Sequence, residues 1–132
     1  MGQSKSMLVE TKIMNTKEIA ERLVIHCRKG AWEAAQKELY SDDAISVEPF
    51  SSPAFEKETR GLPAIVEKGI KFNAMVETMH SIVVSDPLVA NNSFACTMQM
   101  DVTMKQEGRM NMTELCVYEV KDGKIISEQF HM

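Results

Sequence analysis

The chain has 132 residues, of which 44% are hydrophobic and 26% are charged, a composition typical of one globular domain with a buried core. Its formal net charge of −4 and the lack of any lysine- and arginine-rich run argue against nucleic acid as a partner. No apolar run is long enough to span a membrane, and no secretory signal sequence is apparent. The three cysteines lack metal-ligand spacing, which favours reduced, buried thiols in a cytoplasmic protein.

The N-terminal region predicts an arm followed by a helix. Residues 1–13 have no clear period and are expected to form a flexible arm, which leaves residues 14–132 as a single domain. Asn15 is followed three residues later by Glu18, and this pair is typical of a capping box at a helix start. The helix is expected to end before Gly30, because glycine commonly follows the last helical turn.

Two further helices and a short strand are predicted next. A second helix is expected over residues 31–39, a short strand over residues 44–48, and a third helix from Pro63, a residue that suits a first helical turn. Residues 50–61 are polar and without a period, which predicts a loop that forms the rim or the lid of a pocket.

The C-terminal part predicts an antiparallel meander of long strands. Residues 76–84 form the first expected strand, and residues 85–87 are expected to bulge before it resumes. Residues 93–105 alternate between apolar and polar side chains, which indicates a strand with one buried face. Residues 106–108 suit a three-residue hairpin loop, and Asp122-Gly123 is typical of a two-residue turn. Helices followed by antiparallel strands indicate an α+β fold.

The turn lengths predict which side chains share a face of the sheet. The three-residue loop is expected to place Met100 opposite Glu114, and the Asp-Gly turn to place Glu114 opposite His131. A slip of one residue, or a bulge, would instead turn Glu114 toward solvent. With the expected register, one face carries an apolar set and a polar cluster: Met98, Met100, Met112, Cys116, Glu114, Tyr118, Gln129 and His131.

Five short motifs occur in an order typical of a known family. They are Gly30-Ala31-Trp32, the segment LYSDDA at residues 39–44, Glu48-Pro49-Phe50, the segment GLPAI at residues 61–65 and DGKI at residues 122–125. In this order they resemble SnoaL-like proteins, which belong to the superfamily of nuclear transport factor 2, ketosteroid isomerase and scytalone dehydratase. The resemblance covers residues 15–132. It implies a cone-shaped α+β roll, with three N-terminal helices packed on a curled antiparallel sheet around an apolar pocket.

The resemblance also implies roles for particular residues. In ketosteroid isomerases the acid before Pro-Phe is the general base, and Glu48 stands in that place. The tyrosine that those enzymes carry on the first helix is missing here, and their second acid corresponds to either Glu114 or Cys116. Glu114 and His131 are candidate catalytic partners of Glu48. His80 would join them only if the predicted bulge shifts its strand by one residue.

Three functions remain compatible with these patterns. The first is a cofactor-independent acid/base enzyme, of isomerase, cyclase, dehydratase or hydrolase type, acting on a small apolar substrate. The second is a ligand-binding module without turnover, and the third is a dimeric interaction domain. Trp32 and Phe72 are expected to line the pocket, and no metal or other cofactor is expected. A homodimer is expected through the outer sheet face, which carries Thr97, Gln99, Thr113, Leu115, Val117 and Phe130.

Overall fold

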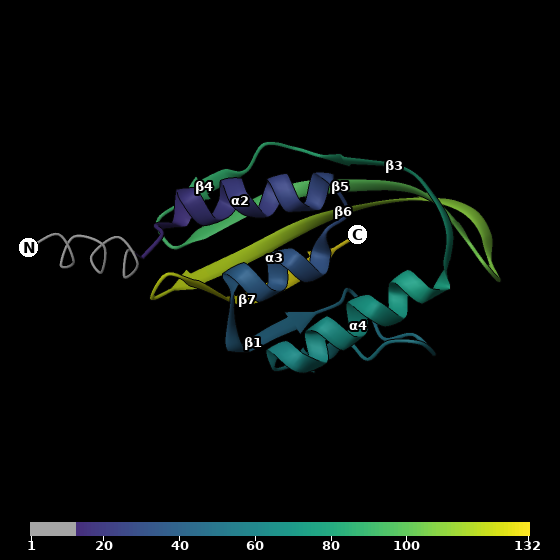
Figure 1. The fold of residues 1–132 in the computed structure, drawn as a ribbon, viewed down its shortest axis with the longest axis horizontal. Helices are drawn as coiled ribbons and strands as arrows, with labels where there is room; N and C mark the ends of the chain where they lie inside the picture. The colour runs from purple at the N-terminus through teal and green to yellow at the C-terminus, as the bar shows by residue number, and fades with distance from the viewer. Residues whose placement is uncertain (1–12) are drawn as a thin grey trace, which may run out of the picture.

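The computed structural model describes residues 13–132, so the predicted arm lies outside the described residues except for Ile13. Three helices pack on one side of a curled sheet (Figure 1). The helices are α2 (Thr16–Arg28), α3 (Trp32–Leu39) and α4 (Leu62–Met75). The strands are β1 (Tyr40–Val47), β2 (Glu58–Arg60), β3 (Val76–Val84), β4 (Leu88–Ala90), β5 (Ser93–Met104), β6 (Gly108–Lys121) and β7 (Lys124–His131).

The helices begin and end where the sequence predicts. The Asn15 side chain accepts a hydrogen bond from the Glu18 amide at 2.8 Å, and the Glu18 carboxylate accepts one from the Asn15 amide at 2.9 Å. This reciprocal pair is the predicted capping box of α2. The helix ends two residues before Gly30, and α4 starts with Pro63 in its first turn. The predicted second helix is present as α3.

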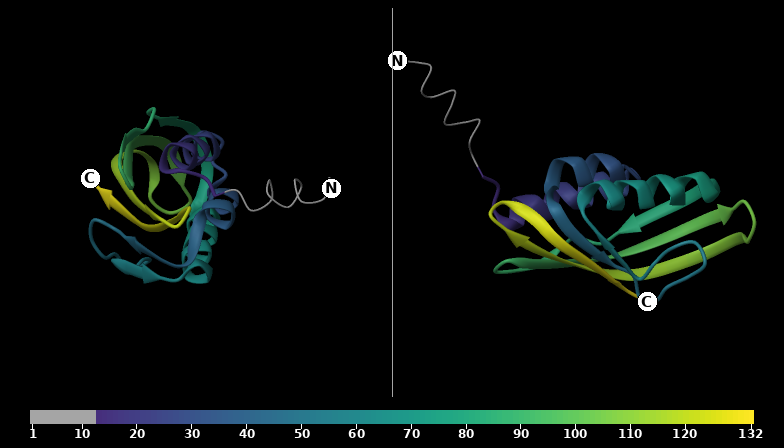
Figure 2. Two further views of the ribbon diagram at one scale, coloured as in Figure 1. Left: turned by 90° about the vertical axis from the view of Figure 1, so that its left-hand side faces the viewer. Right: turned by 90° about the horizontal axis from the view of Figure 1, so that it is seen from below.

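The sheet is mixed, which corrects the expectation of a wholly antiparallel one. The strand order is β2-β1-β7-β6-β5-β3, with β4 also paired to β5, and β1 runs parallel to β7. Turn residues specify only strands that are neighbours in sequence, and most of the chain separates β1 from β7, so nothing local fixes their direction. The strands curl around the helices, leaving them inside the arc (Figure 2).

The β5–β6 register differs from the predicted one by two residues. The loop comprises residues 105–107 instead of 106–108, so Gly108 pairs with Met104 as the first residue of β6. Met98 therefore lies opposite Glu114, and Met100 lies opposite Met112. The predicted partners are wrong, but each side chain stays on its predicted face because a shift of two residues preserves the alternation.

The β6–β7 register agrees with the prediction only near the turn. Lys121 lies opposite Lys124, but the register then shifts by one residue, leaving Ile126 as the extra residue of β7. Beyond this bulge Tyr118 lies opposite Glu128, and Leu115 lies opposite His131. Every β7 side chain after the bulge therefore points to the face opposite the predicted one.

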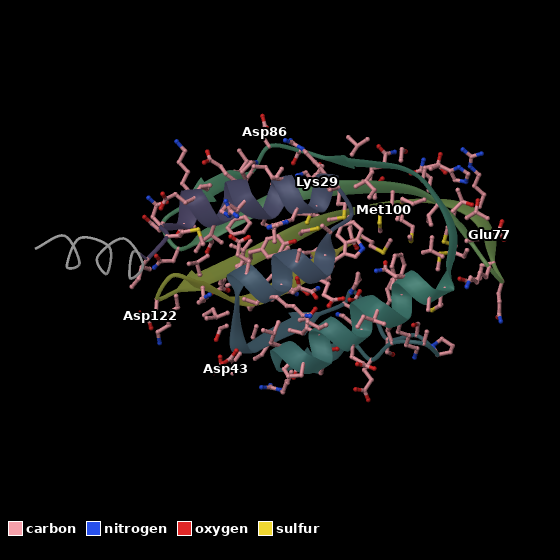
Figure 3. The ribbon with its side chains drawn as sticks, viewed as in Figure 1. Lys29, Asp43, Glu77, Asp86, Met100 and Asp122 are labelled. Atoms are coloured by element: carbon pink, nitrogen blue, oxygen red, sulfur yellow. The ribbon has the colours of Figure 1, made fainter. Side chains whose placement is uncertain are left out.

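The core lies between the helices and the concave face of the sheet. The three cysteines, Cys27, Cys96 and Cys116, are buried and free, as predicted. Met100 lies in this interior, whereas the labelled acidic residues Asp86 and Asp122 lie at the periphery (Figure 3). None of the helices within residues 13–132 is long and apolar enough to cross a membrane.

Candidate functional site

A cavity of about 760 Å³ opens between α3, α4 and the inner face of β5, β6 and β7. Most of the side chains predicted to line a pocket do line it, namely Trp32, Phe72, Met98, Met100, Met112 and Tyr118. Cys116 is fully buried and is not among the lining residues, and Gln129 is exposed because of the bulge in β7. Phe130, predicted for the outer face, lines the cavity instead.

The loop after β1 forms part of the cavity wall, as predicted for a rim. All residues from Pro49 to Phe55 except Ser51 contribute to the lining, and Phe50 is 62% exposed. On the outer side of the loop, the Lys71 ammonium donates a hydrogen bond to the Ala54 carbonyl oxygen and lies 5.2 Å from the Phe55 ring centroid. The loop is thus fastened to α4, which keeps this wall of the cavity in place.

Glu48 lies at the cavity, where the alternation of β1 directs it. Ala44 and Ser46 are fully buried, and Glu48 continues the same face one residue after the strand. Its carboxylate oxygen Oε2 is 2.8 Å from the Nζ of Lys68, which reaches across from α4. Lys68 Nζ also donates to Ser46 Oγ at 2.7 Å. Both side chains of this ion pair are partly buried, so each charge loses part of its hydration. The direct contact between the two charges offsets that loss.

A second carboxyl group, that of Glu128, lies behind this ion pair. Glu128 is only 3% exposed and accepts hydrogen bonds from the hydroxyls of Ser46, at 2.6 Å, and Tyr40. Burial raises the pKa of Glu128, and the two hydroxyl donors and the Lys68 charge offset part of that increase. The contacts form a continuous chain from Tyr40 through Glu128, Ser46 and Lys68 to Glu48.

Glu114 is the third carboxyl group of the cavity. It is partly buried on β6, and removal from water together with the negative charges of Glu48 and Glu128 raises its pKa to about 7. The Lys68 ammonium acts in the opposite direction. Glu114 therefore changes charge near neutral pH, which is the range useful for proton transfer.

The two candidate histidines lie elsewhere. His131 lies opposite Leu115, is exposed, and points away from Glu114, so the predicted Glu114–His131 pair is wrong. His80 is exposed at a register shift in β3, and its Nε2 is 2.7 Å from Thr103 Oγ1. The bulge in β7 and the bulge at His80 account for these positions, because each reverses the alternation of its strand.

Sequence reasoning missed Lys68, Glu128, Tyr40 and Ser46 as members of the site. A signal for Lys68 was available, because it lies three residues after Ile65 and four before Phe72, which are both inward-facing positions of α4. A signal for Glu128 was weaker. The large aromatic side chain of Phe130 favours an inward position, and Glu128 shares its strand phase.

The potential metal ligands of the described residues are dispersed. Within residues 13–132, no three side chains of His, Cys, Asp or Glu form a group that could hold a metal ion. The carboxyl groups of Glu128 and Glu48 instead contact hydroxyls and one ammonium, respectively. What the cavity offers is a set of proton donors and acceptors in apolar surroundings.

Comparison with known proteins assigns the chain to a family. The model of the SnoaL-like domain matches residues 14–132. The chain belongs to the SnoaL-like domain family. A candidate SnoaL-like polyketide cyclase from Mesorhizobium loti is 31% identical to this SnoaL-like domain, with a TM-score of 0.83 over 90% of this chain and 100% of that one. A search of curated proteins found no match.

More distant structures share the fold of this SnoaL-like domain. A protein of unknown function with a cystatin-like fold from Xanthomonas campestris has a TM-score of 0.75 at 19% identity, covering 89% of each chain. A protein with a ketosteroid isomerase-like fold from Catenulispora acidiphila, solved with trimethylamine, has a TM-score of 0.68 at 15% identity. The latter match covers 87% of this chain and 85% of that one. The expected α+β roll is thereby confirmed.

Proposed function

We propose that this SnoaL-like domain is a cofactor-independent enzyme that moves protons to and from a small, largely apolar molecule. The observation that carries the proposal is the presence of unlike carboxyl groups in one apolar cavity. Glu48 is paired with an ammonium, whereas Glu114 has a pKa of about 7. Carboxyl groups in contrasting environments are suited to opposite roles as base and acid.

The roles follow from the environments. Glu48 lies beside the rim loop, where its ionised carboxylate is the general base toward a carbon-bound or oxygen-bound proton. Glu114 lies on β6 and, in its protonated form, donates a hydrogen bond or a proton to the molecule being transformed. The apolar side chains around them lower the local dielectric constant, which strengthens both interactions. The likeness to a candidate polyketide cyclase supports chemistry of this type.

A ligand-binding module without turnover is the second candidate. Seven methionines line the cavity, and methionine suits walls that adapt to different ligands. They are Met75, Met98, Met100, Met104, Met110, Met112 and Met132. Such a wall favours binding of several apolar molecules. It does not itself require the carboxyl groups.

Proton exchange distinguishes these two functions. A panel of weak carbon acids, comprising ketones and nitroalkanes, would be incubated in D₂O with the protein, and loss of the C–H signal followed by NMR. We expect Glu48→Gln to slow exchange by about two to four orders of magnitude, the usual contribution of a general base. Glu119→Gln, an exposed residue of β6, is the matched control and should leave the rate unchanged. Binding of the same compounds with no exchange above buffer would favour the binding module.

We further propose a homodimer formed through the outer face of the sheet, in a cytoplasmic protein. Leu115 is 42% exposed and Val83 is 59% exposed on that face, where polar and β-branched side chains surround them. A surface that mixes apolar and polar side chains in this way suits a two-fold interface. The three free, buried cysteines agree with a reducing compartment.

A further inference from the structure

Lys68 occupies an unusual position for a lysine, inside the cavity. Its side chain is 15% exposed, and it extends from the inner face of α4, one turn after the fully buried Ile65. An ammonium in apolar surroundings is costly unless oxygen acceptors replace its water. Glu48 and Ser46 supply two acceptors, at 2.8 Å and 2.7 Å from Nζ.

One donor of this ammonium remains for a bound molecule. A lysine ammonium has three protons, and the contacts with Glu48 and Ser46 use two of them. Residues 13–132 provide no third oxygen acceptor for Nζ, and its remaining flank faces the Phe130 ring, whose centroid is 5.8 Å away. Since Lys68 and Phe130 both line the cavity, the third proton is available to a ligand placed between them and the rim.

The Ser46–Glu128 contact fixes the direction of the ammonium. A serine hydroxyl has a single proton, and that of Ser46 is given to Glu128 at 2.6 Å. Ser46 can therefore only accept from Lys68, so one Nζ proton is anchored toward β1. Glu128 is in this way a positioning residue for Lys68, acting through Ser46.

We propose that Lys68 binds the oxygen on which negative charge develops when Glu48 removes a proton from the substrate. The inference rests on the proposed function and deepens it, because it makes the substrate an enolisable carbonyl compound. The C–H proton passes to Glu48, the C–H electron pair becomes the C=C bond, and the carbonyl π electrons move to oxygen as an enolate. No other reactant is needed.

The charges of the site favour this sequence. Before the transfer the negative charge lies on Glu48, and afterwards it lies on the substrate oxygen while Glu48 is neutral. Lys68 therefore loses one charged partner as it gains another, and its bond through the third proton strengthens as the reaction proceeds. An interaction that strengthens toward the transition state accelerates the step, whereas one of constant strength does not. Ketosteroid isomerases carry a tyrosine on the first helix that this chain lacks. In this proposal Lys68 on α4 supplies the hydrogen bond to the substrate oxygen in its place.

Chromophoric phenols test the inference without turnover, since a phenolate resembles an enolate in shape and charge. The Glu48→Gln variant is the appropriate background, because its neutral amide gives the site the charge it has after proton transfer. Absorbance titration would measure the pKa of a bound nitrophenol in Glu48→Gln and in the same variant combined with Lys68→Met or Lys68→Arg. Combining Lys68→Met with Glu48→Gln also avoids leaving the Glu48 carboxylate in the cavity without its ammonium partner.

We expect Glu48→Gln to bind the phenolate about ten- to a hundredfold more tightly than the phenol, as one charge-assisted hydrogen bond allows. Lys68→Met should abolish that preference, and Lys68→Arg should keep part of it. Lys37→Met, at an exposed ion pair on α3, should have no effect. A preference that persists in Lys68→Met, or equal affinity for phenol and phenolate in Glu48→Gln, would overturn the role of Lys68. Glu48-dependent exchange of carbon acids would stand in that case, so the two proposals fail separately.

Discussion

The hydroxyl of Ser46 on β1 donates a hydrogen bond of 2.6 Å to the carboxyl group of Glu128 on β7, across a parallel pair of strands. The contact joins two segments that are far apart in the sequence and connects a buried acid to the Lys68–Glu48 ion pair. It therefore affects both the stability of the fold and the arrangement of the cavity. Its energetic consequence is directly measurable.

Replacement of Glu128 by Gln should destabilise the protein by roughly 1–3 kcal/mol, because an amide NH₂ cannot accept from a hydroxyl donor. Chemical denaturation at neutral pH measures this change. Ser46→Ala and the double variant complete a mutant cycle, in which the two effects should be less than additive. Additive effects would show that the hydroxyl and the carboxyl group contribute independently.

Glu114 should make the protein less stable as the pH rises. Its pKa is about 7 in the folded chain against an ordinary value of 4.5, so the folded state binds more protons between these values. The free energy of unfolding should fall across that window and level off above it. The raised pKa of Glu128 acts in the same direction.

Glu114→Gln should remove the Glu114 part of this slope. The variant should gain stability over the wild type as the pH rises through the window, by up to about 3 kcal/mol. Denaturation at several pH values measures the gain, with Glu119→Gln on the same strand as the control. A Glu114→Gln variant with the same pH dependence as wild type would mean that the carboxyl group is better hydrated than its position on the cavity wall implies.

Two turn glycines form a matched pair for testing close packing. Gly108 and Gly123 both have positive φ angles, of 81° and 77°. A Cβ at Gly108 would meet nothing within 4 Å, whereas one at Gly123 would overlap a methyl carbon of Ile13. Gly108→Ala should therefore cost about 1 kcal/mol of backbone strain, and Gly123→Ala should cost more. Equal losses in thermal denaturation would mean that Ile13 moves aside freely.

The proposed dimer predicts a surface variant that dissociates. Leu115→Lys introduces a charge at the centre of the outer sheet face, so it should convert a dimer to a monomer near 14.9 kDa in sedimentation. Ile70→Lys, at a 47% exposed position of α4, is the control and should remain dimeric. A wild type that sediments as a monomer at micromolar concentration would exclude this interface.

Local signals predicted most of the fold and part of the site. The Asn15–Glu18 capping box, the Asp122-Gly123 turn and the alternation of β5 each act over a few residues, so the sequence carries them directly. The position of Glu48 also followed from alternation, because β1 continues to it without a bulge after Ala44.

The site residues on β7 were not predicted, because they depend on a bulge that has no clear signal in the sequence. Ile125 and Ile126 are both apolar, so the alternation of β7 gives no sign that Ile126 is the extra residue. Because of this extra residue, Glu128 and Phe130 point into the cavity, and the predicted pair Gln129 and His131 points outward. The parallel pairing of β1 with β7 was equally hidden, because no turn connects the two strands.

The same parallel pairing links the completion of the cavity to protein synthesis. One of the two neighbours of β1 in the sheet is β7, so a growing chain holds Tyr40 and Ser46 without their acceptor until translation has passed Glu128. The closing of so long a loop is entropically costly and can occur only late. During translation, α2, α3 and α4 therefore emerge well before the strand that completes the cavity, and the acidic site cannot form until β7 has been synthesised.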